Sequence, residues 1–214
     1  MFGFDLQEIL LLLPGIIIGL TVHEFCHAFA AYKLGDNTAK EMGRLTLNPI
    51  KHIDPIGFLF IIFARFGWAK PVQFNPGNLR NYRRDKALIA AAGPASNLVL
   101  VLIFAGLSRL CYFIASGNLS INLYIFITYI FVISRFAVMI NLGLMIFNLL
   151  PIPPLDGSHI AFSGLNLSAE TEYRIMRLGA PLLFLIIIAQ RILDITILPI
   201  VPIVSFLYNF LMPF

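Results

Sequence analysis

Apolar residues form four long runs along this chain, and polar segments rich in proline and charge separate them. The runs cover about residues 9–34, 87–115, 133–150 and 178–196. A helix needs about 17–25 apolar residues to cross a bilayer, so the pattern predicts four transmembrane helices. Residues 195–214 are also apolar, and the pattern leaves open whether they continue the fourth span, re-enter the membrane or form a fifth span.

The segment between the first two runs, residues 36–86, has a different pattern. Several X-Pro steps interrupt it, and each disfavours helix at the residue before the proline. Residues 44–47 alternate between polar and apolar, which predicts a short strand. Residues 58–64 are apolar but too few to cross, so we expect them to dip into the membrane or to lie at its surface. The predicted fold is an all-α polytopic membrane protein with about four to five transmembrane helices and a small membrane-associated β or re-entrant segment.

The composition is that of a membrane domain. Hydrophobic residues make up 59% of the 214 residues and charged residues 12%, with a mean hydropathy of +0.87. Soluble domains carry about 25% charged residues, so a soluble globular protein is excluded. The length predicts a single domain over residues 1–214, with its core in residues 9–160.

Basic residues set the expected orientation. Ten of the fifteen Lys and Arg residues lie within residues 33–86, and two more follow in residues 158–177. Because basic residues accumulate on the cytoplasmic side of membrane spans, we expect segments 36–86 and 158–177 in the cytoplasm and the chain in the cell membrane of a prokaryote. The third apolar stretch extends over residues 119–150 and is too long for one untilted crossing, and Arg135 indicates that its part before about that residue is interfacial. Apolar and proline-rich sequence interrupts the basic residues, which argues against nucleic-acid binding.

The first apolar run contains the motif His23-Glu24-Phe25-Cys26-His27. Helix residues four apart are about 40° out of register, so the two histidines lie on one face and can bind one zinc ion. Glu24 is placed to act as a general base. A lone charge at the bilayer centre costs about 2.5–3.5 kcal/mol, so ionisable residues here indicate a functional site. Metal-dependent hydrolysis within the bilayer is the function that they favour.

A catalytic zinc ion generally has a third protein ligand and one open position. Asp156 is the leading candidate, because it follows the third apolar run and a group of prolines that end the helix and turn the chain. Two neutral histidines, one aspartate and Zn²⁺ leave a formal positive charge, which Glu24 neutralises. A neutral site suits surroundings of low dielectric constant.

Two motifs occur in order along the chain: H-E-F-C-H at residues 23–27 and N-L-L-P-I-P-P-L-D-G at residues 148–157. Together they resemble the site-2 protease family of intramembrane zinc metalloproteases. Gly93-Pro94-Ala95-Ser96-Asn97 is similar to the G-P-x-x-N element of that family. Residues 67–81 are similar to a small branch of it without PDZ or CBS domains. The resemblance covers roughly residues 15–160.

The resemblance implies a zinc-dependent intramembrane endopeptidase that hydrolyses peptide bonds in or near transmembrane segments of membrane-anchored substrates. It implies one Zn²⁺ ion per chain, bound by His23, His27 and Asp156, with Glu24 as the catalytic base and later proton donor. The expected partners are a transmembrane protein or peptide substrate and the lipid bilayer, with no nucleic acid. The residues carry no signal for an oligomeric state.

The resemblance also implies that Asn148 and Asn97 hold the substrate backbone or stabilise the oxyanion. Hydrogen bonding between helices is the alternative role for both residues. His159 follows Asp156 closely enough to border the site, although packing at the start of a helix is the simpler expectation.

Two other functions stay open. A membrane metal or proton transporter also uses buried histidine and carboxylate residues, but it needs no general base such as Glu24 beside its ion. A membrane zinc protease of the prenyl-protein processing type would take Glu170 or Glu172 as its third ligand in place of Asp156.

Overall fold

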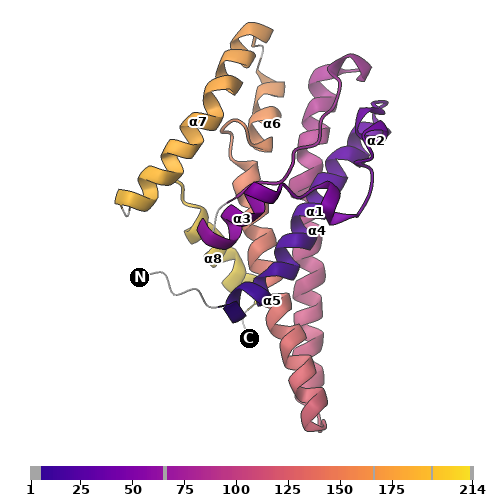
Figure 1. Ribbon diagram of the computed structural model, residues 1–214, viewed down its shortest axis with the longest axis vertical. Helices are drawn as coiled ribbons and strands as arrows, with labels where there is room; N and C mark the ends of the chain where they lie inside the picture. The colour runs from indigo at the N-terminus through magenta and orange to yellow at the C-terminus, as the bar shows by residue number, and fades with distance from the viewer. Residues whose placement is uncertain (1–5, 65–66, 166, 194, 213–214) are drawn as a thin grey trace.

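The computed structural model describes residues 6–64, 67–165, 167–193 and 195–212 (Figure 1). Its elements are, in order, α1 (Leu6–Lys33), α2 (Thr38–Glu41), η1 (Pro49–Lys51), α3 (Pro55–Ala64), η2 (Pro76–Asn78), α4 (Tyr82–Ala115), α5 (Ile121–Leu149), α6 (Asp156–Gly164), α7 (Ala169–Leu193) and α8 (Ile200–Leu211). Apart from one isolated β-bridge, every regular element in these ranges is helical. The predicted all-α class is therefore confirmed.

Three of the described helices, α1, α4 and α5, are long and apolar enough to cross a membrane. They pack against one another through small residues (Figure 1). An added Cβ at Gly15 would lie 2.9 Å from Ala137 Cα, and one at Gly19 would lie 2.9 Å from Asn141 Oδ1. Such close backbone approach is how helices associate in lipid, where hydrophobic burial no longer drives packing. We call these three helices the bundle.

The helix boundaries lie near the predicted spans for α1 and α4 but differ for α5. The side chain of Asn81 caps α4 by accepting a hydrogen bond from Arg84 N at 3.2 Å, and α4 ends at Ala115 as predicted. By contrast, α5 begins at Ile121 and not near residue 133. No proline or glycine lies between residues 121 and 134, so nothing stops the helix in the stretch that was expected to be interfacial.

The predicted strand at residues 44–47 does not form, because these residues are bends and irregular chain. Gly43 turns the chain just before them with φ at 68°, a conformation that other residues rarely adopt. Pro49 starts a 3₁₀ turn just after them. The buried side chain of Arg44 donates a hydrogen bond to Lys70 O, so a side-chain contact and not a strand ladder ties this segment to residue 70.

Residues 67–75 form an extended stretch, which we call the covering segment. The described β-bridge joins its residue Ala69 to Ile53 in antiparallel fashion, and Lys70 N donates to His52 O at 2.8 Å. In Figure 1, α3 lies at about mid-height beside the bundle, whereas α2 and the start of α4 lie at one end. The connection between α1 and α4 therefore reaches back along the bundle before α4 begins.

The C-terminal third contains α6, α7 and α8. The predicted fourth span, residues 178–196, falls in α7 and the residues after it, of which residue 194 lies outside the described ranges. Among the described residues, α7 is not one of the helices long and apolar enough to cross a membrane. A fourth crossing therefore stays a prediction. With 12 residues, α8 is about 18 Å long and too short to cross alone. It packs against the bundle in a cluster that includes Val138, Leu142 and Met212.

Candidate metal centre

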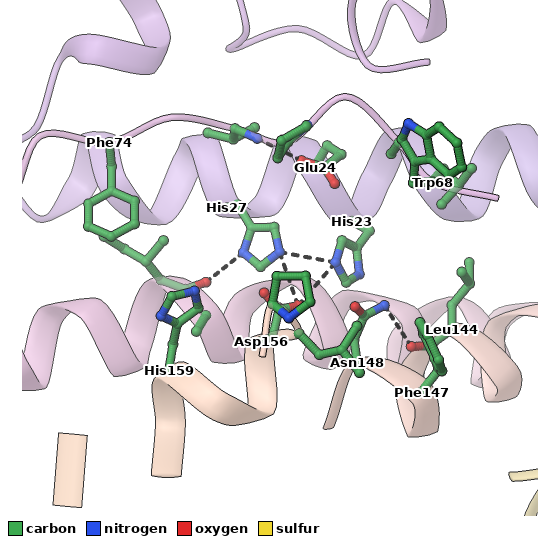
Figure 2. Close-up of a pocket in the computed structure, with 18 of the residues that line it drawn as sticks. His23, Glu24, His27, Trp68, Phe74, Leu144, Phe147, Asn148, Asp156 and His159 are labelled. Atoms are coloured by element: carbon green, nitrogen blue, oxygen red, sulfur yellow. Dashed lines mark hydrogen bonds and ion pairs between the residues drawn. The ribbon is translucent and has the colours of Figure 1, made fainter. Parts of the chain in front are cut away.

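His23 and His27 occupy adjacent turns of α1 and face the same way (Figure 2). Their Nε2 atoms lie 3.0 Å apart, and the two rings meet edge to face with centroids 4.6 Å apart. Both residues are buried. The helical spacing in the motif therefore brings the two imidazoles together as predicted.

Asp156 is the first residue of α6 and lies against both histidines. α5 ends at Leu149, and the prolines that follow turn the chain so that α6 starts beside α1 and α4 (Figure 1). Asp156 Oδ2 lies 3.2 Å from His23 Nε2 and 3.3 Å from His27 Nε2. The structure thus brings the three predicted ligands, from two distant parts of the sequence, into one group with donor atoms within 4.8 Å of one another.

Both histidine rings are oriented through their other nitrogen. His27 Nδ1 lies 2.7 Å from Ile89 O, and His23 Nδ1 lies 2.7 Å from Asn97 Oδ1. A carbonyl oxygen only accepts, so each Nδ1 carries the proton. In a neutral ring the Nε2 lone pair is then directed at the centre of the group, as in histidines that bind metal.

Asn97 is itself oriented by two further contacts. Its Nδ2 donates to Gly19 O at 3.3 Å and to Asn141 Oδ1 at 2.9 Å. Asn141 Nδ2 in turn donates to Ala137 O at 2.8 Å. Because both chains of contacts end at backbone carbonyls, only one amide orientation satisfies them, and it presents Asn97 Oδ1 to His23.

The position of Asn97 differs from the one expected of a substrate contact. Its side chain is fully buried between helices, and both of its amide groups are already bonded. It is not among the residues that line the cavity at the metal group. Asn97 lies about four turns after the start of α4 and meets His23 because α4 packs against α1. The G-P-x-x-N element alone does not reveal this contact.

The group fits a zinc ion. The Nε2 lone pairs and Asp156 Oδ2 are all acceptors, and Asp156 Oδ2 has no hydrogen-bond partner among the described residues. Three converging acceptors repel one another unless a cation lies between them. Their separations of 3.0–3.3 Å are close to the ~3.3 Å between ligands that hold zinc tetrahedrally at about 2.0–2.1 Å.

Gly93 keeps the space beside the two rings open. A Cβ added at this position would overlap His27 Nε2 and would lie 2.6 Å from His23 Nε2. In the sequence, Gly93 stands out only as the first residue of the G-P-x-x-N element. Its steric role becomes evident once α4 is seen to cross α1 at the histidines.

Glu24 lies beside the metal group and is held by the covering segment. Its Oε2 accepts a hydrogen bond from Val72 N at 3.0 Å. Figure 2 shows the covering segment running along α1 from Phe74 past Glu24 to Trp68. Arg44, through its bond to Lys70 O, supports the same segment. The contact between residues 24 and 72 had no signal in the sequence.

The end of the covering segment is anchored by Asp36, which is fully buried after α1. Asp36 Oδ2 accepts from Asn75 N at 2.8 Å, and Oδ1 accepts from Asn78 Nδ2 at 2.7 Å and from Thr38 Oγ1 at 2.6 Å. Burial alone raises the pKa of Asp36, but these hydrogen bonds outweigh it and lower the pKa below its usual value. The anchoring carboxylate is therefore ionised.

A cavity of about 450 Å³ opens onto the metal group. Figure 2 shows Trp68, Leu144 and Phe147 at the end of the cavity near His23, and these side chains make that end largely apolar. Phe74 and His159 lie at the other end, near His27. Asn148 lines the cavity, and its Nδ2 donates to Leu144 O at 2.9 Å.

His159 borders the site, one turn after Asp156, and lines the cavity instead of only packing at the start of α6. Burial, and secondarily the positive charge of Lys86, lower the pKa of His159 to about 4. Its ring is therefore neutral at neutral pH.

The two glutamates considered as alternative ligands lie elsewhere. Glu172 pairs with Lys86, and Glu170 pairs with Arg174 at 2.5 Å on an exposed part of α7. Neither belongs to the donor group that the described residues form at the histidines. Asp156 is the carboxylate that this fold brings to the two rings.

Comparison with known proteins gives a matching family model and several named relatives. Residues 124–186, which include Asp156 and Asn148, match the model of peptidase family M50. The chain is 46% identical over 145 residues to a Bacillus subtilis (strain 168) protein that bears the name zinc metalloprotease YwhC, and the alignment covers 68% of this chain and 64% of that protein. No solved structure gives a significant match.

Two mycobacterial relatives bear the name zinc metalloprotease Rip2. The protein of Mycolicibacterium smegmatis is 34% identical over 156 residues, and that of Mycobacterium tuberculosis (strain H37Rv) is 29% identical over 153 residues. Each alignment covers 69% of this chain and 54% of the relative, so the chain spans between about half and two thirds of the length of these relatives. The matched family model, the relatives and the two motifs agree, and the chain belongs to peptidase family M50, the site-2 protease family of zinc metalloproteases.

Proposed function

We propose that this chain is a zinc-dependent intramembrane endopeptidase that hydrolyses peptide bonds in or near transmembrane segments of membrane-anchored substrates. The observation that carries the proposal is the group of three converging acceptor atoms, with Glu24 beside it, among helices apolar enough to cross a membrane. A purely structural role gives no reason to bury a carboxylate oxygen that lacks a hydrogen-bond partner.

In this proposal His23, His27 and Asp156 hold one Zn²⁺ ion. Bound zinc supplies a Lewis acid that polarises a carbonyl oxygen and makes water nucleophilic at neutral pH. Ile89 O and Asn97 keep the Nδ1 protons in place, so that both Nε2 lone pairs stay available to the ion. The role of the chain here is to fix the ligands before the ion arrives.

Glu24 is the general base. Val72 N–H fixes one of its carboxylate oxygens, and the other takes a proton from the attacking water. The same carboxyl group then gives this proton to the amine nitrogen that leaves. General acid–base groups contribute about 10²–10⁴-fold to a rate, which sets the scale for its removal.

Asn148 contacts the substrate backbone or the oxyanion in this proposal. It lines the cavity, and its bond to Leu144 O uses one amide hydrogen, which leaves the second hydrogen and Oδ1 for a peptide. A neutral amide donates a hydrogen bond without adding a buried charge. Asn97 is assigned to His23 instead, because its amide is already bonded on both sides.

The proposed arrangement in the membrane follows from the bundle. The chain forms one catalytic domain in which α1, α4 and α5 cross the cell membrane and α7 adds a fourth crossing. Segments 36–86 and 158–177 lie on the cytoplasmic side. In Figure 1 the start of α4, α6 and the start of α7 lie at the same end of the molecule, which supports this orientation.

Zinc content and cleavage of a panel of transmembrane peptides test the proposal. Purified wild type is expected to carry about one zinc ion per chain and to cut some of the peptides. Glu24→Gln is expected to keep zinc and to lose cleavage by about 10²–10⁴-fold. Asp156→Asn is expected to lose both. Glu41→Gln changes an exposed carboxylate on α2 and serves as the control.

Other results assign the chain to another function. Zinc flux into vesicles without proteolysis by wild type or by Glu24→Gln identifies a transporter. Retention of zinc by Asp156→Asn together with its loss from Glu172→Gln identifies the prenyl-protein type of site. Either result overturns the proposal.

A further inference from the structure

A second cavity lies beside the one at the metal group and has a volume of about 480 Å³. The two cavities share three wall residues, Phe74, Lys86 and His159. The start of α4 and the start of α7 complete the second cavity. The two cavities therefore adjoin at these side chains, and together they outline a path for a peptide that passes the metal group toward His159.

The two ends of this path differ in polarity. The end beside His23 is walled by Trp68, Leu144 and Phe147 (Figure 2), which suits the apolar part of a transmembrane segment. The opposite end leads to the second cavity, where two cationic side chains, Lys86 and Arg83, and the carboxylate of Glu172 line the wall. The path thus matches a peptide that changes from apolar to polar at the edge of a membrane.

Lys86 is the charged group between the two cavities. It is only 6% exposed, and its ammonium group is also 5.4 Å from the ring centroid of Tyr82. Its Nζ forms an ion pair with Glu172 Oε1 of α7. A buried cation requires a partner, and the partner observed here is a carboxylate.

The carboxylate that pairs with Lys86 belongs to a helix with few anchors. Near this cavity, α7 contacts the rest of the chain through Ser158 Oγ and Met176 Sδ at 3.9 Å, and through Gly179 against Pro153. The side chain of Glu172 is 20% exposed and that of Lys86 is 7% exposed. A carboxylate that arrives from the substrate can therefore replace Glu172, while Lys86 stays fixed on α4.

We propose that the second cavity is a subsite for the polar flank of the substrate, and that Lys86 selects flanks that carry an aspartate or glutamate. This proposal rests on the proposed function, because it names the substrate class of the same site. Most membrane segments carry lysine or arginine at their cytoplasmic ends. Lys86 repels such flanks, so the subsite separates a minority of acidic-flanked segments from the rest.

The test uses one transmembrane peptide with a single flanking position varied as Asp, Asn or Lys, and this position is moved stepwise along both flanks. Assays run in uncharged detergent, so that no anionic lipid headgroup competes for the cavity. We expect wild type to cleave the best Asp peptide about tenfold better in kcat/KM than its Lys counterpart, which is the low end of what a hydrogen bond to a charged group contributes. Lys86→Glu is expected to reverse the order.

Lys86→Met is expected to cleave the Asp and Lys peptides with similar kcat/KM values. Arg84→Met serves as the control, because Arg84 is an exposed neighbour on α4 that does not line the cavity, and it is expected to keep the wild-type preference. Zinc content reports whether each variant folds, and the Lys86→Glu, Glu172→Lys double variant restores the ion pair if the single variants are unstable.

Measuring how tightly the Glu24→Gln variant binds each peptide makes the test independent of hydrolysis. We expect this variant to bind the Asp peptide about tenfold more tightly than the Lys peptide. An equal affinity for the two peptides, or an unchanged Asp preference in zinc-loaded Lys86→Met, overturns the subsite. If the preference is present in binding but no peptide is ever cut, the proposed proteolysis fails and the subsite stands.

Discussion

The two sides of the metal centre are built differently. On one side, His23 and His27 belong to a helix packed closely within the bundle, and each ring donates a hydrogen bond from Nδ1 to α4. On the other side, Asp156 begins a short helix that is joined to α7, and its Oδ2 has no hydrogen-bond partner in the described structure apart from its contacts with the histidines.

This difference indicates a division of labour. The bundle side, with the covering segment, fixes two of the proposed ligands and the proposed base before any substrate enters, as preorganised sites require. The side formed by α6 and α7 supplies the third proposed ligand and Glu172, the carboxylate that pairs with Lys86 of α4 in the second cavity. Changes in the bundle beside the two histidines should therefore act first on metal binding, and changes in α7 should act first on substrate choice.

The largest effect is expected from Gly93→Ala, which tests the bundle side directly. The added methyl group would overlap His27 and would lie 2.6 Å from His23 Nε2, so both rings must move. We expect zinc content to fall from about one ion per chain to almost none, measured by metal analysis of the purified protein. Gly106→Ala, on the same helix with no atom within 4 Å of the added carbon, should keep its zinc, and equal zinc in both variants would contradict the proposed role.

A smaller effect is expected from Asn97→Leu, which leaves the His23 ring in place but removes its partner at Nδ1. Loss of such an outer contact typically costs about 10–100-fold in metal affinity, and competition with a chelator measures it. Asn141→Leu acts one step further out and should cost less. Asn122→Leu, at an exposed position of α5, is the control, and a zinc affinity that Asn97→Leu leaves unchanged would argue against the orientation of His23 by Asn97.

The smallest effect is expected from Gly179→Ala, on the side of α7. The new carbon would lie 2.6 Å from Pro153 O, so α7 must shift away from the turn before α6. We expect full zinc content and a severalfold change in the relative cleavage of acidic-flanked and neutral peptides. Gly164→Ala meets no atom within 4 Å and should match wild type. A loss of zinc from Gly179→Ala would show that the two sides are not separate.

Local signals in the sequence account for the parts of the site that were predicted. Helix geometry places His23 and His27, four residues apart, on one face. The prolines before Asp156 predict a turn that exposes its carboxylate. Proline and apolar runs likewise located α1 and α4. Each of these inferences depends on residues that are close together in the chain.

The remaining parts depend on contacts between distant residues. Asn97 meets His23 across 74 residues, and Val72 meets Glu24 across 48 residues, so neither contact leaves a periodic signal. The expected strand at residues 44–47 failed for the same reason. Its alternation is real, but the inward bond from Arg44 to Lys70 O competes with pairing and prevails.

The hydrogen bond from Val72 N to Glu24 has a consequence for resistance to inhibitors. The donor at position 72 is a peptide N–H, so any residue there except proline retains the contact. The side chain of Val72 can thus be replaced without loss of the donor that holds the base. An inhibitor that contacts the Val72 side chain would therefore be easy to escape. One that contacts the imidazoles of His23 and His27 and the carboxylates of Glu24 and Asp156 would instead bind the residues that the proposed mechanism requires.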